Sequence, residues 1–263
     1  MTLKPSQSGK ILFRRQDLGG VEVEPDPRRI DAVNCSCLVF ESGRIHTLEH
    51  LMAVLYVLGL DSLDIELWGG EIPILDGSAA PLARAVLEAG VVPVDQKRRV
   101  VRVLKPHILE EDGASLSFSP AADLKISYAI DFNHPLIGRQ EISFDLTRDI
   151  FLKEIAPART FGFLKDVTDL WKRGLALGGT LDSAVVLDES GTISGPLRFR
   201  DEFVRHKVLD LIGDLALFGH PLLGRFQAEK AGHRLHHRAV LFLLENPDFW
   251  AFEEIIIPRF LGD

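Results

Sequence analysis

The chain has 263 residues, of which 46% are hydrophobic and 26% are charged, a balance that is typical of a folded protein with a substantial core. Its formal net charge is −8, and no stretch of it concentrates five or more lysines and arginines. Because nucleic-acid binding needs a basic surface that neutralises phosphates, we predict no nucleic-acid partner.

The chain carries no segment that we interpret as a membrane span or a secretory signal. Met1–Lys10 lacks an apolar stretch, and the longest apolar run, Leu51–Leu60, is too short to cross a bilayer. The two cysteines, Cys35 and Cys37, lie on one face of a predicted strand and do not form a disulfide framework. These features predict a cytoplasmic protein with reduced thiols and no transmembrane segment.

The first half of the chain is predicted to alternate between strands and helices. Thr47 is a suitable N-cap for the first helix and Gly59 ends it, whereas Pro81 and Gly90 suit the start and the end of the second helix. In chain order we predict a strand at Asn34–Phe40, a helix at Leu48–Leu58, a strand at Leu63–Leu67 and a helix at Pro81–Gly90. The basic stretch Lys97–Arg99 is the best boundary between two domains, at 1–98 and 99–263.

The second half is predicted to open with a hairpin, because Asp112-Gly113 is a strong signal for a tight turn. Strands and helices then follow without a steady strand-helix-strand alternation, which favours an α+β fold. The predicted strands are Val100–Leu109, Ser115–Ser119, Leu124–Phe132, Gln140–Leu146, Ser183–Asp188 and Arg225–Ala228. The predicted helices are Asp149–Ile155, Asp166–Arg173, Asp201–Phe218 and a final one that begins near His233.

The predicted helix Asp201–Phe218 carries a polar face opposite an apolar one. At 100° per residue, Asp210 and Asp214 lie about 40° and about 80° from His206. The apolar face is formed by Val204, Val208, Leu211, Ile212 and Leu215. A histidine and an aspartate four residues apart can bind one metal ion, although a solvated face with an ion pair would have the same pattern.

Glu49 and His50 begin the first predicted helix and could complete such a metal site. A catalytic zinc ion takes three protein ligands and one open position, and His50, His206 and Asp210 supply that number. Glu49 would then be the neighbouring base. The alternative is that Glu49 only complements the helix dipole.

A second interpretation of the same segment involves His46. His46-Thr47-Leu48-Glu49-His50 matches the pattern H-x-x-E-H, in which both histidines bind zinc from one helix. If Thr47 is the N-cap, His46 lies outside the helix and that geometry is lost.

The motifs of the chain, taken in order, resemble those of the UDP-3-O-acyl-N-acetylglucosamine deacetylases, the zinc-dependent enzymes of lipid A biosynthesis. The match begins at Gly9–Arg15 and continues almost to the C-terminus. The segments that carry it are Thr47–Met52, Glu71–Pro81, Asp131–Pro135, Ala158–Phe163, Leu177–Asp182, Phe199–Asp214 and Gly232-His233.

The resemblance implies an α+β fold of two domains, each with a β-sheet layer packed against two helices, and an active site between the domains. It implies a zinc ion held by His50, His206 and Asp210. Glu49 would be the general base toward the attacking water, and His233 would be the protonated partner of the oxyanion and of the leaving amine.

The same resemblance implies supporting and substrate-binding roles. Asp214 would orient His233 and raise its pKa, and Thr160 would donate a hydrogen bond to the oxyanion. Two lysines and two aromatic residues would bind the sugar nucleotide: Lys207, Lys230, Phe161 and Phe163. An insert near 164–184 would shape a passage for the fatty acyl chain, lined by Leu164, Val167, Leu170, Trp171 and Leu175. All of these apolar residues, and both aromatic ones, could equally be ordinary core.

The predicted activity is removal of the N-acetyl group of UDP-3-O-(3-hydroxyacyl)-N-acetylglucosamine, the committed step of lipid A biosynthesis. The first alternative is a weak or inactive relative that binds the UDP-sugar or regulates the pathway. The second is a zinc hydrolase of another acylated amine.

The family usually starts with a strand and a glycine-rich loop, and Met1–Pro5 enters after that loop. We therefore expect a truncated start and an open sheet edge that allows self-association.

Overall fold

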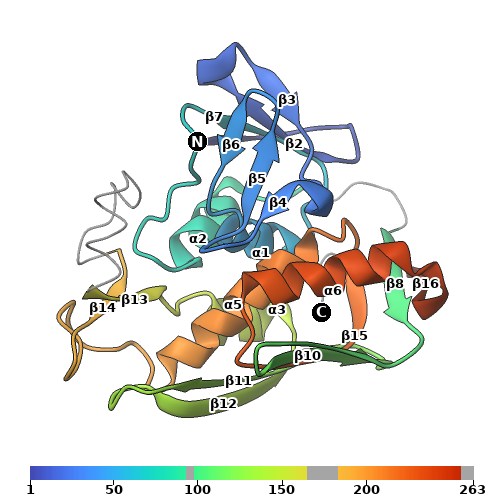
Figure 1. Ribbon diagram of the computed structural model, residues 1–263. Helices are drawn as coiled ribbons and strands as arrows, with labels where there is room; N and C mark the ends of the chain where they lie inside the picture. The colour runs from blue at the N-terminus through green and yellow to red at the C-terminus, as the bar shows by residue number, and fades with distance from the viewer. Residues whose placement is uncertain (93–97, 165–182, 256–263) are drawn as a thin grey trace.

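The structure is a computed structural model that describes residues 1–92, 98–164 and 183–255. It mixes helices and strands, as the predicted α+β class requires. Figure 1 shows the strands of the N-terminal part at the top, the long helices in the middle and the sheet of β9 to β12 and β15 below them. The α-helices in these ranges are α1 (Glu49–Val57), α2 (Ala80–Ala89), α3 (Arg148–Ile150), α5 (Glu202–Ala216) and α6 (His233–Glu245).

The N-terminal part forms a four-stranded sheet and a three-stranded sheet. The larger sheet has the order β1-β7-β2-β3, in which β2 and β7 are parallel and the other pairs are antiparallel. Its strands are β1 (Thr2–Pro5), β2 (Ile11–Arg15), β3 (Val21–Val23) and β7 (Leu63–Leu67). The smaller sheet consists of β4 (Ile30–Asp31), β5 (Cys37–Phe40) and β6 (Gly43–Ile45).

The predicted sheet edge is formed by β1, which pairs with β7 on one side only within the described part of the chain. Three of its four residues are exposed. A strand at an edge can pair with another chain. Self-association through this edge stays a prediction.

The C-terminal part forms a seven-stranded sheet with the path β12-β11-β15-β10-β9, in which β8 pairs with β15 and β16 pairs with β8. Its strands are β8 (Arg98–Val103), β9 (His107–Glu111), β10 (Ala114–Ser119), β11 (Leu124–Phe132), β12 (Gly138–Asp145), β15 (Leu222–Glu229) and β16 (Trp250–Ile255). A two-stranded sheet pairs β13 (Phe161–Phe163) with β14 (Val185–Leu187). No strand of the N-terminal sheets belongs to these sheets, but the two-domain division at 98 and 99 stays a prediction.

The predicted hairpin is present but shorter than expected. Asp112 and Gly113 have φ of 50° and 79° and connect β9 to β10, as the turn signal indicated. The prediction of one strand at Val100–Leu109 was wrong, because that stretch is divided between β8 and β9, which have different partners. Pro106, which has no N–H for a sheet ladder, lies in the break.

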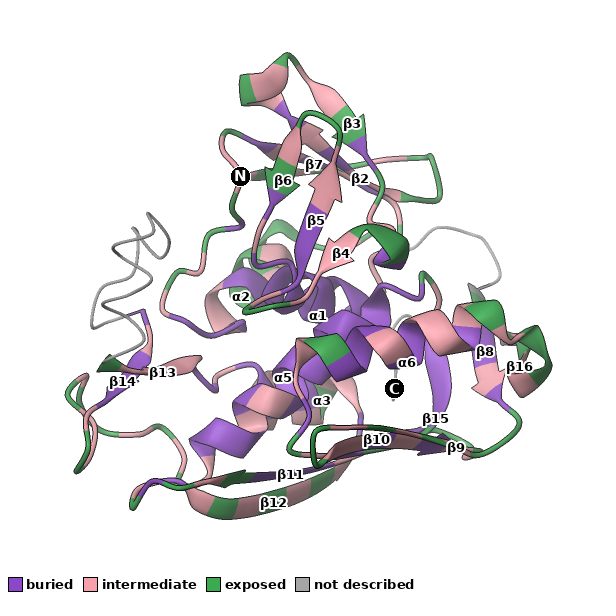
Figure 2. Cartoon of the chain, viewed as in Figure 1, coloured by how far each residue is buried: buried purple, intermediate pink, exposed green. Residues whose placement is uncertain are grey.

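Helix α1 is the centre of the core. All nine of its residues are buried, and α1 packs mainly against α5 (Figure 2). Apart from Glu49 and His50 in its first turn, and the Tyr56 hydroxyl that accepts from Leu222 N–H, the helix is apolar, and such a helix is stable when it is covered on every side. None of the helices in the described ranges has the length and apolar content needed to cross a membrane.

Two other predictions about single elements changed in the structure. Thr47 is not the N-cap of α1: Leu48 precedes the helix, and Thr47 has φ of 63°. The predicted helix Asp149–Ile155 is α3 followed by a π-helical turn, Phe151–Ile155. Strands β1 to β4, β6, β13 and β16 were not predicted. The predicted helix Asp166–Arg173 and most of the proposed acyl passage lie outside the described residues.

Candidate active site

The contact between α1 and α5 brings together the three residues predicted to bind a metal. The Asp210 Oδ1 atom lies 3.2 Å from His206 Nε2 and 3.9 Å from His50 Nε2. One ligand atom from each of the three residues lies within 4.8 Å of the others, and all three residues are buried. The solvated helix face considered as an alternative is therefore wrong, since both faces of α5 are covered.

The hydrogen bonds of His50, His206 and Asp210 leave one atom with a free lone pair on each residue, and these atoms could bind a metal ion. His206 Nδ1 lies 3.1 Å from the carbonyl oxygen of Ala158, so Nδ1–H can donate to that oxygen while Nε2 keeps its lone pair. His50 Nδ1 is buried without a hydrogen-bond partner, and burial with the nearby His206 lowers the pKa of His50 to about 3. Two imidazoles and one carboxylate form a donor set that fits a divalent metal ion.

The third ligand, Asp210, is held as a carboxylate. Its Oδ2 atom accepts from Lys207 Nζ at 2.5 Å. Burial opposes the charge of Asp210, but His206 and Lys207 outweigh it and hold the pKa of this carboxyl well below its usual range. Lys207, which the sequence assigned to substrate, thus contacts a predicted metal ligand directly.

Glu49 lies beside this cluster in the first turn of α1. Its Oε2 atom accepts from the backbone N–H of Ser36 at 3.0 Å. Burial raises the pKa of Glu49 to about 7, against the opposing effect of His233. A carboxyl group with this pKa can accept a proton near neutral pH.

His233, at the first position of α6, is held by Asp214 of α5. Its Nδ1 atom donates to Asp214 Oδ2 at 2.8 Å, and its Nε2 atom lies 3.9 Å from Asp210 Oδ2. Burial alone would lower the pKa of His233, but Asp214 raises it to about 9. His233 is therefore the cationic neighbour of His50, His206 and Asp210, which we name the metal cluster because they could hold a metal ion.

Asp214 has more partners than the sequence analysis anticipated. His236 Nδ1 donates to Asp214 Oδ2 at 2.8 Å, and the Ser36 hydroxyl and His237 Nε2 lie at Oδ1, the latter at 3.3 Å. Burial lowers the pKa of His236 to about 4, so this imidazole is neutral. The spacing of His233, His236 and His237 by three and four residues on one helix could have indicated a shared face. No sequence pattern of this kind indicated that Ser36 would contact Asp214.

Phe161 approaches His206 through its ring, and the preceding residue, Thr160, is held by its backbone. Thr160 N–H donates to the carbonyl of Gly77 at 2.8 Å, and its own carbonyl accepts from Val185 N–H at 2.7 Å. The Phe161 ring lies 6.4 Å from the His206 ring. Phe163 is farther along the same strand, 6.2 Å from the ring of Phe132.

The segment that carries Thr160 is anchored by a buried ion pair that the sequence analysis did not single out. Arg159 Nε donates to Glu202 Oε1 at 2.9 Å, and the Arg159 backbone N–H donates to the same oxygen at 3.0 Å. Glu202 is fully buried at the start of α5. Because Ala158, which bonds His206, immediately precedes Arg159, this pair also supports a predicted metal ligand.

Lys230 is less central than expected. It forms an exposed ion pair with Asp131 at 2.8 Å. Its φ of 52° is uncommon for a residue with a side chain, and such conformations are often found at functional sites.

His46 does not join the metal cluster. Its backbone lies outside α1 and bridges Glu71, with His46 N–H donating to Gly70 at 2.8 Å. The H-x-x-E-H interpretation is therefore wrong, because it needs both histidines on one helix. The left-handed turn at Thr47 separates the two.

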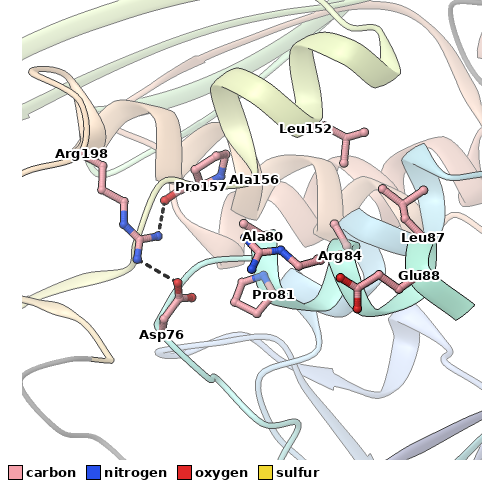
Figure 3. Close-up of a pocket in the computed structure, with 11 residues that line it drawn as sticks. Asp76, Ala80, Pro81, Arg84, Leu87, Glu88, Leu152, Ala156, Pro157 and Arg198 are labelled. Carbon is pink, nitrogen blue, oxygen red and sulfur yellow. Dashed lines mark hydrogen bonds and ion pairs between the residues drawn. The ribbon is translucent and has the colours of Figure 1, made fainter.

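A cavity of about 700 Å³ lies between α2 and the π-helical turn (Figure 3). Among its lining residues, Arg198 donates to Asp76 at 2.8 Å and to the carbonyl of Pro157 at 2.8 Å. None of the predicted site residues lines this cavity, so it is separate from the metal cluster.

The chain is similar to known proteins over most of its length. Residues 1–245 match the LpxC family, described as UDP-3-O-acyl N-acetylglycosamine deacetylase. Proteins named UDP-3-O-acyl-N-acetylglucosamine deacetylase are similar over most of the chain. That of Thermodesulfovibrio yellowstonii is 42% identical, over 97% of this chain and 87% of that protein. Those of Acidithiobacillus ferrooxidans and Brucella ovis are 43% and 45% identical, over 92% and 93% of this chain and 81% and 86% of those proteins.

Proposed function

The chain belongs to the LpxC family of UDP-3-O-acyl N-acetylglycosamine deacetylases, and we propose that it hydrolyses the N-acetyl group of UDP-3-O-(3-hydroxyacyl)-N-acetylglucosamine. The products would be UDP-3-O-acyl-glucosamine and acetate, in the committed step of lipid A biosynthesis. The observation that carries the proposal is the meeting of His50, His206 and Asp210 beside the acid–base pair Glu49 and His233.

Zinc is the metal that we propose for the cluster, with His50, His206 and Asp210 as its ligands. When bound, zinc makes a water molecule more acidic and polarises a carbonyl group. Two of these side chains are also held in place by hydrogen bonds at the atom that would not bind zinc. Ala158 fixes the ring of His206, and Lys207 fixes the second oxygen of Asp210.

Glu49 is the general base of the proposed reaction. It removes a proton from the water that attacks the acetyl carbonyl, and its raised pKa allows it to hold that proton afterwards. The bond from Ser36 N–H to one carboxylate oxygen leaves the other oxygen for this transfer.

His233 is the general acid. Asp214 keeps its imidazole protonated and oriented, so that Nε2–H can stabilise the oxyanion and then protonate the leaving amine. Thr160 donates a second hydrogen bond to the same oxyanion through its hydroxyl group. Proton removal and proton donation are thus assigned to two groups whose pKa values are both raised, so that between about 7 and about 9 Glu49 is ionised while His233 keeps its proton.

Substrate binding is assigned to Lys207, Lys230, Phe161 and Phe163. Phe161 has the best support, because its ring borders His206. The apolar passage for the acyl chain is assigned to 164–184, of which Leu164 is partly exposed at the beginning. The proposed two-domain arrangement would place the site between 1–98, which supplies Glu49 and His50, and 99–263, which supplies the other site residues.

The test is release of acetate from the UDP-sugar, with and without a zinc chelator. Release that stops with the chelator and returns with zinc supports the proposal. Binding of the UDP-sugar without acetate release would support the inactive relative instead. Release from other acylated amines but not from the UDP-sugar would support a hydrolase of different specificity.

The acyl passage has its own test with UDP-N-acetylglucosamine that lacks the fatty acyl group. Each buried CH₂ contributes about 0.8 kcal/mol, so this substrate should have a much lower kcat/KM. Equal efficiency with both substrates would mean that the segment does not bind the acyl chain.

A further inference from the structure

Ser36 lies where the two catalytic groups of the proposed reaction meet. It is located between the two cysteines, just before β5, and is fully buried. A buried serine needs partners for its hydroxyl and for both backbone groups, because unpaired polar atoms are costly in a core. All three groups of Ser36 have partners, and these come from α1, α5 and α6 or from the residue before α1.

The backbone of Ser36 holds the start of α1. Its N–H donates to Glu49 Oε2 at 3.0 Å, and its carbonyl oxygen accepts from Leu48 N–H at 3.1 Å. Ser36 therefore fixes both the proposed base and the residue that precedes it.

The hydroxyl group of Ser36 points to the other side of the site. It contacts Asp214 Oδ1, and it lies 2.7 Å from His237 Nε2. An ionised aspartate only accepts hydrogen bonds, so the single hydroxyl proton goes to Asp214 and the oxygen accepts from His237. Asp214 in turn holds His233 through its other oxygen at 2.8 Å.

One small residue thus joins the proposed base to the carboxylate that orients the proposed acid. A base and an acid that act on one reacting carbon must keep their separation to a fraction of an ångström. Resting on the proposed function, we infer that Ser36 is a positioning residue that sets the separation and orientation of Glu49 and His233. It touches no substrate itself.

Three variants separate this role from simple packing. Ser36→Ala removes the hydroxyl, Ser36→Cys keeps the volume but is a weak hydrogen-bond donor, and Ser36→Thr keeps the hydroxyl. Loss of a hydrogen bond to a charged partner should lower kcat about 10- to 100-fold in the Ala and Cys variants. KM and zinc content should change little, since neither the ligands nor the substrate contacts are altered. Ser36→Thr should restore most of kcat.

If Ser36 only fills space, kcat of the variants should follow their side-chain volume instead: Ser36→Cys would then be active and only Ser36→Ala impaired. That order, or unchanged kcat in both variants, would overturn the inference. If Ser36→Ala does not fold, the comparison of Ser36→Cys with Ser36→Thr decides in the same way.

A second measurement does not depend on turnover. The Nδ1–H proton of His233, assigned by its loss in His233→Asn, should shift in the histidine NMR spectrum of the Ala and Cys variants and keep its position in Ser36→Thr. An unchanged signal in all three variants would refute the positioning role. If the unaltered chain released no acetate, the proposed function would fail, while this spectrum would still test the link between Ser36 and the Asp214–His233 pair.

Discussion

Gly213 of α5 lies directly against the backbone carbonyl of Glu49 in α1. A Cβ atom at Gly213 would overlap the Glu49 carbonyl group, well inside van der Waals contact. This absence of a side chain allows the two helices to approach so closely that His50 of α1 reaches His206 and Asp210 of α5.

Gly213→Ala should separate α1 from α5 and weaken the metal site. Alanine in place of glycine in a helix interior normally stabilises a protein by roughly 0.5–1 kcal/mol, so a loss of stability here would reverse the usual sign. We expect a lower melting temperature and reduced zinc content, measured by thermal unfolding and metal analysis. Gly191→Ala is the control, because a Cβ atom there meets nothing within 4 Å. Equal behaviour of the two variants would contradict the close approach.

Replacing any proposed metal ligand should remove the metal without unfolding the chain. His50→Ala, His206→Ala and Asp210→Ala should each reduce zinc from about one ion per chain to a small fraction of that, measured by metal analysis. His46→Ala should retain zinc, because His46 lies outside α1. Loss of zinc in His46→Ala would return the H-x-x-E-H interpretation to consideration.

Glu49→Gln should retain zinc and lose turnover. Removal of a general base typically lowers the rate about 10²- to 10⁴-fold. In the intact chain, kcat/KM should rise with pH as Glu49 loses its proton and fall as His233 loses its own. The pKa values are about 7 and about 9 without a metal, and a bound cation would lower both. A pH–rate profile of the intact chain with no falling limb would argue against His233 as the acid.

Glu202→Gln should destabilise the fold in a pH-dependent way. Burial raises the pKa of Glu202, but the hydrogen bonds from Arg159 and Arg198 outweigh it and hold that pKa below its usual range. A carboxyl group with a lowered pKa stabilises the fold above its unfolded pKa, about 4.3, and loses this effect as pH falls through the folded value. Breaking a buried ion pair costs about 3–5 kcal/mol.

The difference in unfolding free energy between the intact chain and Glu202→Gln should therefore be largest near neutral pH and shrink in acid, as measured by denaturant unfolding at several pH values. Lys153→Gln is the matched control, since it breaks an exposed pair with Asp149 and should change the unfolding free energy little. A difference for Glu202→Gln that is constant with pH would contradict the assignment.

Much of the local structure was predictable from short-range patterns. Alternation predicted β11 at its observed bounds, Leu124–Phe132, and the spacing on α5 predicted that His206, Asp210 and Asp214 share a face. These predictions succeeded because pleat and helical periodicity depend on neighbours a few residues apart. Thr47 was misassigned because a left-handed turn of a β-branched residue is rare and has no local signal.

The sequence alone determined the donor chemistry of the site: which histidines and aspartates share a helix, and which motifs place the chain among the deacetylases. The tertiary structure alone decided that Ser36 reaches Asp214 and that the Glu49 backbone packs directly against Gly213. It also decided that His236 and His237 both contact the Asp214 carboxylate. Those contacts join residues far apart in the chain. They depend on how α1, α5 and α6 pack, and packing is set by the shapes of many side chains at once, which no local periodicity records.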